Sequence, residues 1–145
     1  METQQPAPAF TGLHFFVRDM AKTAAFYRLL GLAIEDNPHF VRVSLPNGVA
    51  LAFGSYDLSR GYDPGFQAST GGAMALQFDL PSREAVEAMY AGLMGAGHAG
   101  HLAPFDAFCG SRYAEIEDPD GNIVGFHSPA DDARRSAPPS VFDTA

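Results

Sequence analysis

The chain has 145 residues and a formal net charge of −8, which fits a single domain that buries roughly 70% of its extended surface on folding. The negative charge and the lack of a basic run exclude a nucleic-acid partner, and no apolar run approaches the roughly 20 residues of a membrane helix. The single cysteine excludes an intrachain disulfide, and Met1–Ala9 has neither the basic start nor the apolar core of a signal peptide, so we expect a cytoplasmic protein.

A strand and a helix are the first predicted elements. Leu13–Val17 is a short apolar run that predicts a strand. Asp19 is a suitable N-cap for a helix over Met20–Leu30, and Gly31 stands where a left-handed C-cap residue belongs. The sequence therefore predicts a strand that leads directly into a helix.

A hairpin and a linker complete the first half of the chain. Phe40–Leu45 and Val49–Phe53 are strand-like runs on either side of Pro46-Asn47-Gly48, which is a turn signal. Ser55–Gly72 is rich in Gly, Ser, Asp and Tyr. We interpret this segment as the linker between the two halves.

The second half repeats the same order of elements. Met74–Phe78 predicts a strand, and Ser82 is the N-cap of a helix over Arg83–Met94. Gly95–Gly100 follows as a glycine-rich loop. The remaining predicted elements are two hairpin strands and a polar tail, namely Tyr113–Glu117, Ile123–His127 and Asp131–Ala145.

The two halves correspond at a fixed offset. Phe40 opens the first hairpin and Tyr113 opens the second, while Gly48 and Gly121 close the two turns; 113 − 40 and 121 − 48 both give 73. We therefore predict an α+β fold of two tandem βαβββ modules. The modules span about residues 10–57 and 72–129, with a linker at 58–71 and a tail at 130–145. A site made by two copies of one module should lie between them.

Several segments together carry a resemblance to a known family. They are Val17-Arg18-Asp19, Phe26-Tyr27, Leu30-Gly31-Leu32, Gly110-Ser111-Arg112 and Asp118-Pro119-Asp120-Gly121-Asn122. In register with the doubled module, over about Phe10 to Ser128, they resemble the vicinal oxygen chelate superfamily of glyoxalases, bleomycin resistance proteins and extradiol dioxygenases. The resemblance implies a half-open barrel around a central cavity, in which the enzymes of the family hold a divalent metal with His and Glu side chains.

The resemblance also places the four metal-ligand positions of the family on this chain. They fall on Gly12, Ala52, Ala73 and Gly125. None of these residues has the carboxylate, imidazole or thiolate that a metal needs. We therefore expect no metal and no other cofactor, and we expect open volume where the ligands would stand.

Strand alternation and the family's inward and rim positions extend the candidate site. Side chains two residues apart face the same side of a strand. The candidate ligand-binding residues are His14, Phe16, Phe40, Arg42, Ala52, Ala73, Gln77, Phe105, Phe108, Cys109, Tyr113, Glu115 and His127. Apolar walls with a few polar groups are usual for a small-molecule pocket, and rings such as Phe16, Phe40 and Tyr113 suit stacking on a flat ligand.

Some of these residues also have a purely structural interpretation. His14 could contact a ligand, bind a relocated metal, or lie half-buried with a backbone partner. Glu115 could act as a general base, or it could pair with Arg42 across the pseudo-twofold axis, because an unpaired buried charge is costly. Cys109 could be a small hydrophobic residue at the mouth of the cavity instead of a nucleophile.

Two pairs of residues near the second helix are also left with alternatives. Phe105 and Phe108 could cap a ligand or cover the second helix. His98 and His101 could form a metal pair, but their glycine-rich surroundings favour flexible, exposed side chains.

Two functions fit these features. The first is metal-independent binding of a hydrophobic or aromatic small molecule in the cavity between the modules, similar to the antibiotic-sequestering resistance proteins of the family. The alternative is an enzyme: a glyoxalase-like or dioxygenase-like lyase or isomerase with a relocated metal, or with a metal-free acid–base site built on Glu115 and His14. The resemblance also implies a homodimer, with no nucleic-acid or membrane partner.

Overall fold

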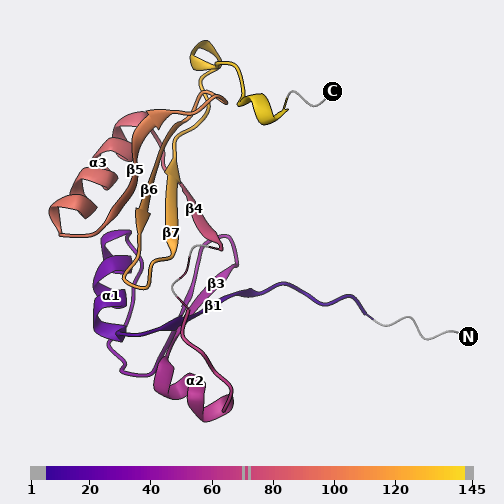
Figure 1. The fold of residues 1–145 in the computed structure, drawn as a ribbon, viewed down its shortest axis with the longest axis vertical. Coiled ribbons are helices and arrows are strands. Elements are labelled where there is room, and N and C mark those ends of the chain that lie inside the picture. Colours follow the sequence, from indigo (N-terminus) through magenta and orange to yellow (C-terminus); the bar gives the residue numbers. More distant parts are fainter. Residues whose placement is uncertain (1–5, 70, 72, 143–145) are drawn as a thin grey trace, which may run out of the picture.

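The computed structural model describes residues 6–69, 71 and 73–142, and these residues form two β-sheets with helices packed on them. Figure 1 shows that the sheets stay open and do not close into a barrel. The predicted α+β fold of two tandem modules is confirmed.

The first module forms a three-stranded sheet. Its elements are β1 (Gly12–Val17), α1 (Met20–Leu29), β2 (Phe40–Ser44) and β3 (Ala50–Ser55), followed by α2 (Tyr56–Tyr62). β3 is the central strand, parallel to β1 and antiparallel to β2. The sheet therefore has two edge strands, and both lend side chains to the site described below.

The second module forms a four-stranded sheet with the order β4-β7-β6-β5. Its elements are β4 (Ala75–Asp79), α3 (Arg83–Gly95), β5 (Gly100–Asp106), β6 (Arg112–Glu117) and β7 (Ile123–His127), followed by short 3-10 turns at Asp132–Arg134 and Ser140–Phe142. Figure 1 shows α3 lying beside β5 and β6, along one face of this sheet.

Module one differs from module two between its helix and its hairpin. Within the described residues no strand forms between α1 and β2, where module two has β5. Asn37 and Pro38 occupy this segment, and the Asn37 side chain accepts hydrogen bonds from the backbone N–H groups of His39 and Phe40. A side chain that satisfies these backbone groups, next to a proline with no N–H, favours a turn over a ladder.

The predicted helix caps are confirmed. The Asp19 carboxylate accepts a hydrogen bond from the Lys22 N–H, and the Ser82 hydroxyl accepts one from Ala85 N–H. Gly31 has a φ of 92°, a left-handed conformation that glycine adopts without strain. These local signals were sufficient to place both long helices to within one residue at each end.

The strands β1, β2, β4 and β6 each bury one face and leave the other more open. On β1, Phe15 and Val17 are buried, whereas His14 is exposed and Phe16 keeps 50% of its surface exposed. The same alternation holds on β2, where Val41 is buried between exposed neighbours. The open faces are therefore the sides of the sheets that the sequence assigned to a cavity.

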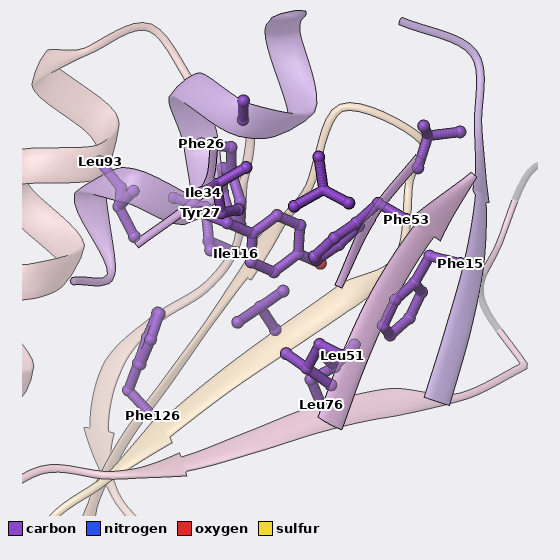
Figure 2. Close-up of a cluster of buried hydrophobic side chains, with 14 of the residues drawn as sticks. Phe15, Phe26, Tyr27, Ile34, Leu51, Phe53, Leu76, Leu93, Ile116 and Phe126 are labelled. Carbon is purple, nitrogen blue, oxygen red and sulfur yellow. The ribbon is translucent and has the colours of Figure 1, made fainter. Parts of the chain in front are cut away.

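The buried faces of both sheets share one hydrophobic core with α1 and α3. Figure 2 shows the rings of Tyr27 and Phe53 meeting in the middle of this core, with their centroids 4.8 Å apart. Ile116 and Phe126 of module two are almost completely buried in the same cluster. Since the two modules share this core, we expect neither to be stable alone.

A buried hydrogen bond ties α1 to the second hairpin. The Tyr27 hydroxyl donates to Asp118 Oδ2 over 2.8 Å, and both residues are buried. Asp118 also accepts from the backbone N–H groups of Asp120 and Asn122, so it fixes the turn between β6 and β7. Burial, followed by the charge of Asp118, raises the pKa of Tyr27 far above its usual range. Arg18 N–H donates to Asp120 Oδ1, which joins the start of α1 to the same turn.

The segment predicted as a linker contains a helix. Ser55 is the N-cap of α2, and its hydroxyl accepts a hydrogen bond from Leu58 N–H. Gly72, where the second module was predicted to begin, lies outside the described residues, as do residues 1–5 of the predicted lead-in and 143–145 of the predicted tail. None of the helices in the described part of the chain has the length and apolar character required to cross a membrane.

Candidate functional site

An aromatic pocket of about 630 Å³ lies on the open face of module one. We use the name aromatic pocket for the space lined by His14, Phe16, Phe40, Leu58, Ser59, Tyr62, Asp63 and Phe66. The imidazole of His14 lies 4.9 Å from the Phe16 ring and 5.8 Å from the Phe40 ring, in the latter case edge-on. Phe66 lies 5.4 Å from Phe16. Four rings thus form a nearly continuous wall.

Small residues on the central strand β3 make room for these rings. His14 of β1 is in register with Ala52, and Phe40 of β2 is in register with Gly54. A Cβ atom at Gly54 would lie 2.6 Å from His14 Nε2, so the imidazole occupies the space that a side chain would take. The two edge strands therefore project their rings over a floor of alanine and glycine.

The rest of the pocket lining comes from α2 and the chain that follows it. Ser59 is buried, and its hydroxyl donates to the Ser55 carbonyl, which holds α2 against the end of β3. Phe66 packs between Phe16 and Tyr56. The sequence interpretation missed Leu58, Tyr62 and Phe66 because it treated this segment as a linker. The recurrence of large apolar side chains in it was the available signal.

A second cluster lies on the open face of module two. We call it the polar face, and it consists of Gln77, Asp79, His101, Tyr113, Glu115, Glu117 and His127. Its centre is a hydrogen-bonded chain, in which Gln77 Nε2 donates to the Tyr113 hydroxyl over 3.0 Å and that hydroxyl donates to Glu115 Oε1 over 2.7 Å. Burial is the main cause that raises the pKa of Tyr113, and the hydrogen bond to Glu115 raises it further. The hydrogen bond from Gln77 acts in the opposite direction.

Two histidines flank this chain. His101 has Nε2 at 3.7 Å from Glu115 and Nδ1 at 3.6 Å from Glu117. His127 Nδ1 lies 3.1 Å from Asp79 Oδ1. Acceptor oxygens with imidazoles beside them can hold or move a proton, which is the basis of general acid–base chemistry.

The structure separates the predicted site residues into groups. His14, Phe16 and Phe40 meet in the aromatic pocket, with Ala52 beneath them, while Gln77, Tyr113, Glu115 and His127 meet on the polar face. Phe105 joins the second group, with its ring edge-on to Tyr113 at 5.8 Å. Ala73 lines a neighbouring crevice of about 290 Å³ that shares His14, Phe16 and Phe66 with the aromatic pocket. Ligand contact by any of these residues stays a prediction.

The expected pair of Arg42 and Glu115 does not form within the described part of the chain. Arg42 is exposed on β2 and has no ion pair there, whereas Glu115 interacts with Tyr113 and His101. The two residues stand on the open faces of different sheets, which the internal repeat alone could not reveal.

The prediction of flexible, exposed side chains for His98 and His101 holds only in part. His101 lies on β5, because that strand already begins at Gly100. His98 packs edge-on against the buried ring of Phe26, with 4.9 Å between the centroids. His98 therefore lies on the glycine-rich loop but is partly buried there, whereas His101 is exposed but lies on a strand.

Phe108 and Cys109 stand on the turn between β5 and β6 and line neither the aromatic pocket nor the polar face. Both side chains are exposed. Hydrogen bonds from the backbone and then the side chain of Ser111 lower the pKa of the Cys109 thiol.

The family's metal does not fit the residues at the four inherited positions. Gly12, Ala52, Ala73 and Gly125 offer no donor atom. A Cβ at Gly12 would lie 2.2 Å from the Ala50 carbonyl oxygen, and one at Gly125 would lie 2.6 Å from the Tyr113 hydroxyl. The described residues hold no group of three or more His, Cys, Asp or Glu side chains that could bind a metal elsewhere. The candidate site is therefore built from the chain's own side chains.

Comparison with solved structures supports the fold. The chain is 24% identical to a glyoxalase-related enzyme from Fulvimarina pelagi, with a TM-score of 0.71 over 88% of this chain and 89% of that one. It is 20% identical to a hypothetical protein from S. aureus, with a TM-score of 0.72 over 87% and 97% of the two chains. A lactoylglutathione lyase from Agrobacterium tumefaciens is 18% identical, with a TM-score of 0.62 over 86% and 96%. At these identities the likeness shows the fold alone.

No match was found among curated proteins. The model of the Glyoxalase/Bleomycin resistance protein/Dioxygenase superfamily matches residues 10–126, which is most of the chain and both modules. The chain therefore belongs to the glyoxalase/bleomycin resistance protein/dioxygenase superfamily.

Proposed function

We propose that this protein binds a flat hydrophobic or aromatic small molecule in the aromatic pocket, without a metal. The observation that carries this proposal is the pocket of about 630 Å³ walled by His14, Phe16, Phe40 and Phe66. This volume lies within the range of roughly 300–1,000 Å³ that is usual for small-molecule sites. Sequestration of an aromatic compound, as in the antibiotic-binding resistance proteins of the family, needs no more chemistry than this.

The exposure of the rings supports a binding role. Phe16 keeps 50% of its surface exposed and Phe40 keeps 41%, although both lie in β-strands of a folded sheet. A stacked ligand would remove this apolar surface from water, which is favourable by roughly 25 cal/mol per Å². Offset stacking or edge-to-face contact with the rings would add to this gain.

Phe16→Ala and Phe40→Ala are each expected to weaken binding of acridine, a flat three-ring probe, about tenfold, because each removes a ring that the probe contacts. Fluorescence titration of the purified proteins measures this. Leu29→Ala is the matched control, since Leu29 is 48% exposed on α1 and does not line the pocket. Chelator should leave the affinity unchanged. Equal affinity in all variants would place the probe elsewhere and remove the support for this site.

A second candidate function is metal-free acid–base catalysis on the polar face. The hydrogen bond of 2.7 Å from Tyr113 to Glu115 favours it, because the pair can pass a proton between a phenol and a carboxylate. His14, which the sequence combined with Glu115 in such a site, instead lines the aromatic pocket.

Glu115→Gln is expected to lower the pKa of Tyr113, because the substitution removes the negative charge that disfavours the phenolate. Alkaline titration of phenolate absorbance measures the shift, and subtraction of the Tyr113→Phe titration isolates this tyrosine. An unchanged or higher Tyr113 pKa in the variant would contradict the coupling of the two groups.

We also propose that the protein forms a homodimer. The support is exposed apolar surface on both open faces: Phe16 and Phe40 on module one, and Leu102 and Phe105 on module two, which keep 40% and 42% of their surface exposed. A second copy could cover such faces. Native mass spectrometry with elemental analysis tests the assembly together with the metal content, and a metal-bearing monomer would contradict both proposals.

A further inference from the structure

We propose that the ligand of the aromatic pocket is a flat organic cation and that Asp63 is its counter-ion. This inference rests on the proposed binding function and specifies the chemical class of the ligand.

The formal charge of the pocket is negative. Among the described residues that line it, Asp63 alone carries a formal charge. Asp63 follows the last turn of α2, and its Oδ1 accepts a hydrogen bond from Gly65 N–H over 2.9 Å. Within the described part of the chain the other carboxylate oxygen has no hydrogen bond or ion pair. The carboxylate is therefore held in place at the rim with one oxygen available for a ligand.

The rings of the pocket favour positive charge as well. The face of an aromatic ring is negative, so a cation within about 6 Å of the centroid is attracted to it. Phe16, Phe40 and Phe66 present their rings to one space, together with Tyr62 and the His14 imidazole. Several aromatic rings with a carboxylate at the rim are the groups that recognise substituted ammonium ions.

The neighbouring basic side chains are not among the residues that line the pocket, although Arg60 contacts the ring of Phe66 and Arg42 is exposed on the same open face. The guanidinium of Arg60 lies 5.7 Å from the Tyr56 ring centroid and 6.0 Å from that of Phe66, and it faces Asp57 at 3.6 Å. Neither Arg60 nor Arg42 lines the pocket. An anionic ligand would therefore meet no cation among the lining residues, and it would approach a chain whose net charge is −8.

The test compares three probes with the same three-ring area: N-methylacridinium, acridine and anthracene-9-carboxylate. Each is titrated at about pH 8, where they are cationic, neutral and anionic, with fluorescence or calorimetry as the readout. We expect the cation to bind about tenfold more tightly than the neutral probe and the anion to bind most weakly.

Asp63→Asn is the diagnostic variant, because the asparagine oxygen can still accept the hydrogen bond from Gly65. We expect it to weaken binding of N-methylacridinium about tenfold and to leave acridine unchanged. Asp57→Asn removes the same charge from α2, outside the pocket, and it should alter neither affinity.

The outcomes separate the two proposals. If acridine and N-methylacridinium bind equally, and both are weakened by Phe16→Ala, the pocket binds ligands but the preference for a cation is refuted. The counter-ion role is refuted if Asp63→Asn and Asp57→Asn weaken the cation to the same extent. If none of the three probes binds, both the proposed function and this inference are overturned.

Discussion

Replacing Asp118 with alanine will lower the free energy of unfolding by about 3 kcal/mol, because several hydrogen bonds to one buried carboxylate are lost together. Asp118 is 5% exposed. Its oxygens accept from the Tyr27 hydroxyl, from two backbone N–H groups and from the Asn122 side chain. Removal of the carboxylate leaves the Tyr27 hydroxyl without a partner in the core and releases the turn between β6 and β7. Urea unfolding followed by circular dichroism measures the change.

Two further substitutions control this experiment. Tyr27→Phe removes the hydroxyl itself, so no unpaired donor remains in the core. A smaller loss of unfolding free energy, about 1–2 kcal/mol, is therefore expected. The double variant should then lose less than the sum of the two single changes, since the residues share one bond. Asp36→Ala removes an exposed carboxylate that pairs with Arg28 and should change stability by less than about 1 kcal/mol. A loss in Asp118→Ala no greater than in Asp36→Ala would disprove the role of the buried bond.

Gly12→Ala is expected to destabilise the protein by about 2–3 kcal/mol. The added Cβ would lie 2.2 Å from the Ala50 carbonyl oxygen and 2.9 Å from its carbon. Both atoms belong to the backbone of the paired strand β3, so they cannot rotate away as a side chain could. The start of β1 has to move away from β3, which disturbs the parallel pairing of the two strands.

Gly92→Ala is the matched control for this substitution. Gly92 lies inside α3, and apart from its chain neighbours and the adjacent helix backbone no atom stands within 4 Å of its added Cβ. Alanine there should increase stability by about 0.5–1 kcal/mol, because it reduces the freedom of the unfolded chain and favours the helix. If Gly12→Ala were as stable as Gly92→Ala, the close approach of β1 and β3 would be disproved.

The steric position of Gly12 also bears on the metal-ligand positions of the family. A histidine or glutamate there would have the same Cβ as alanine and would meet the same carbonyl oxygen. Restoring donor residues at the inherited positions would therefore require movement of the backbone as well as new side chains. The loss of metal ligands and the packing of β1 on β3 are linked in this chain.

The elements that sequence could predict are those set by local chemistry. Asp19 and Ser82 have the side chains of N-caps, and Gly31 has the conformational freedom of a C-cap, so both long helices were placed correctly. Alternation along β1 separated Phe15 from Phe16, and it assigned the exposed ring to the binding face. These signals depend on neighbours in the chain, and neighbours are visible in a sequence.

Arrangements that depend on how the sheets sit relative to one another could not be predicted. The repeat suggested that Arg42 and Glu115 would meet, yet they lie on different open faces, and Glu115 bonds Tyr113, two residues away on the same strand. The helix α2 was missed because its seven residues are too few to give a clear period. Asp63 and Phe66, which follow α2 and line the pocket, were therefore not predicted as site residues.

The alternation of buried and open side chains along β1 and β2 has a consequence for the evolution of this protein. The residues that keep it folded and the residues that would meet a ligand occupy alternate positions on the same strands. An exchange at Phe16 or Phe40 leaves Phe15 and Val41 in the core untouched. New ligands can therefore be acquired by substitutions that the folded state tolerates, so one scaffold can serve many compounds without first being rebuilt.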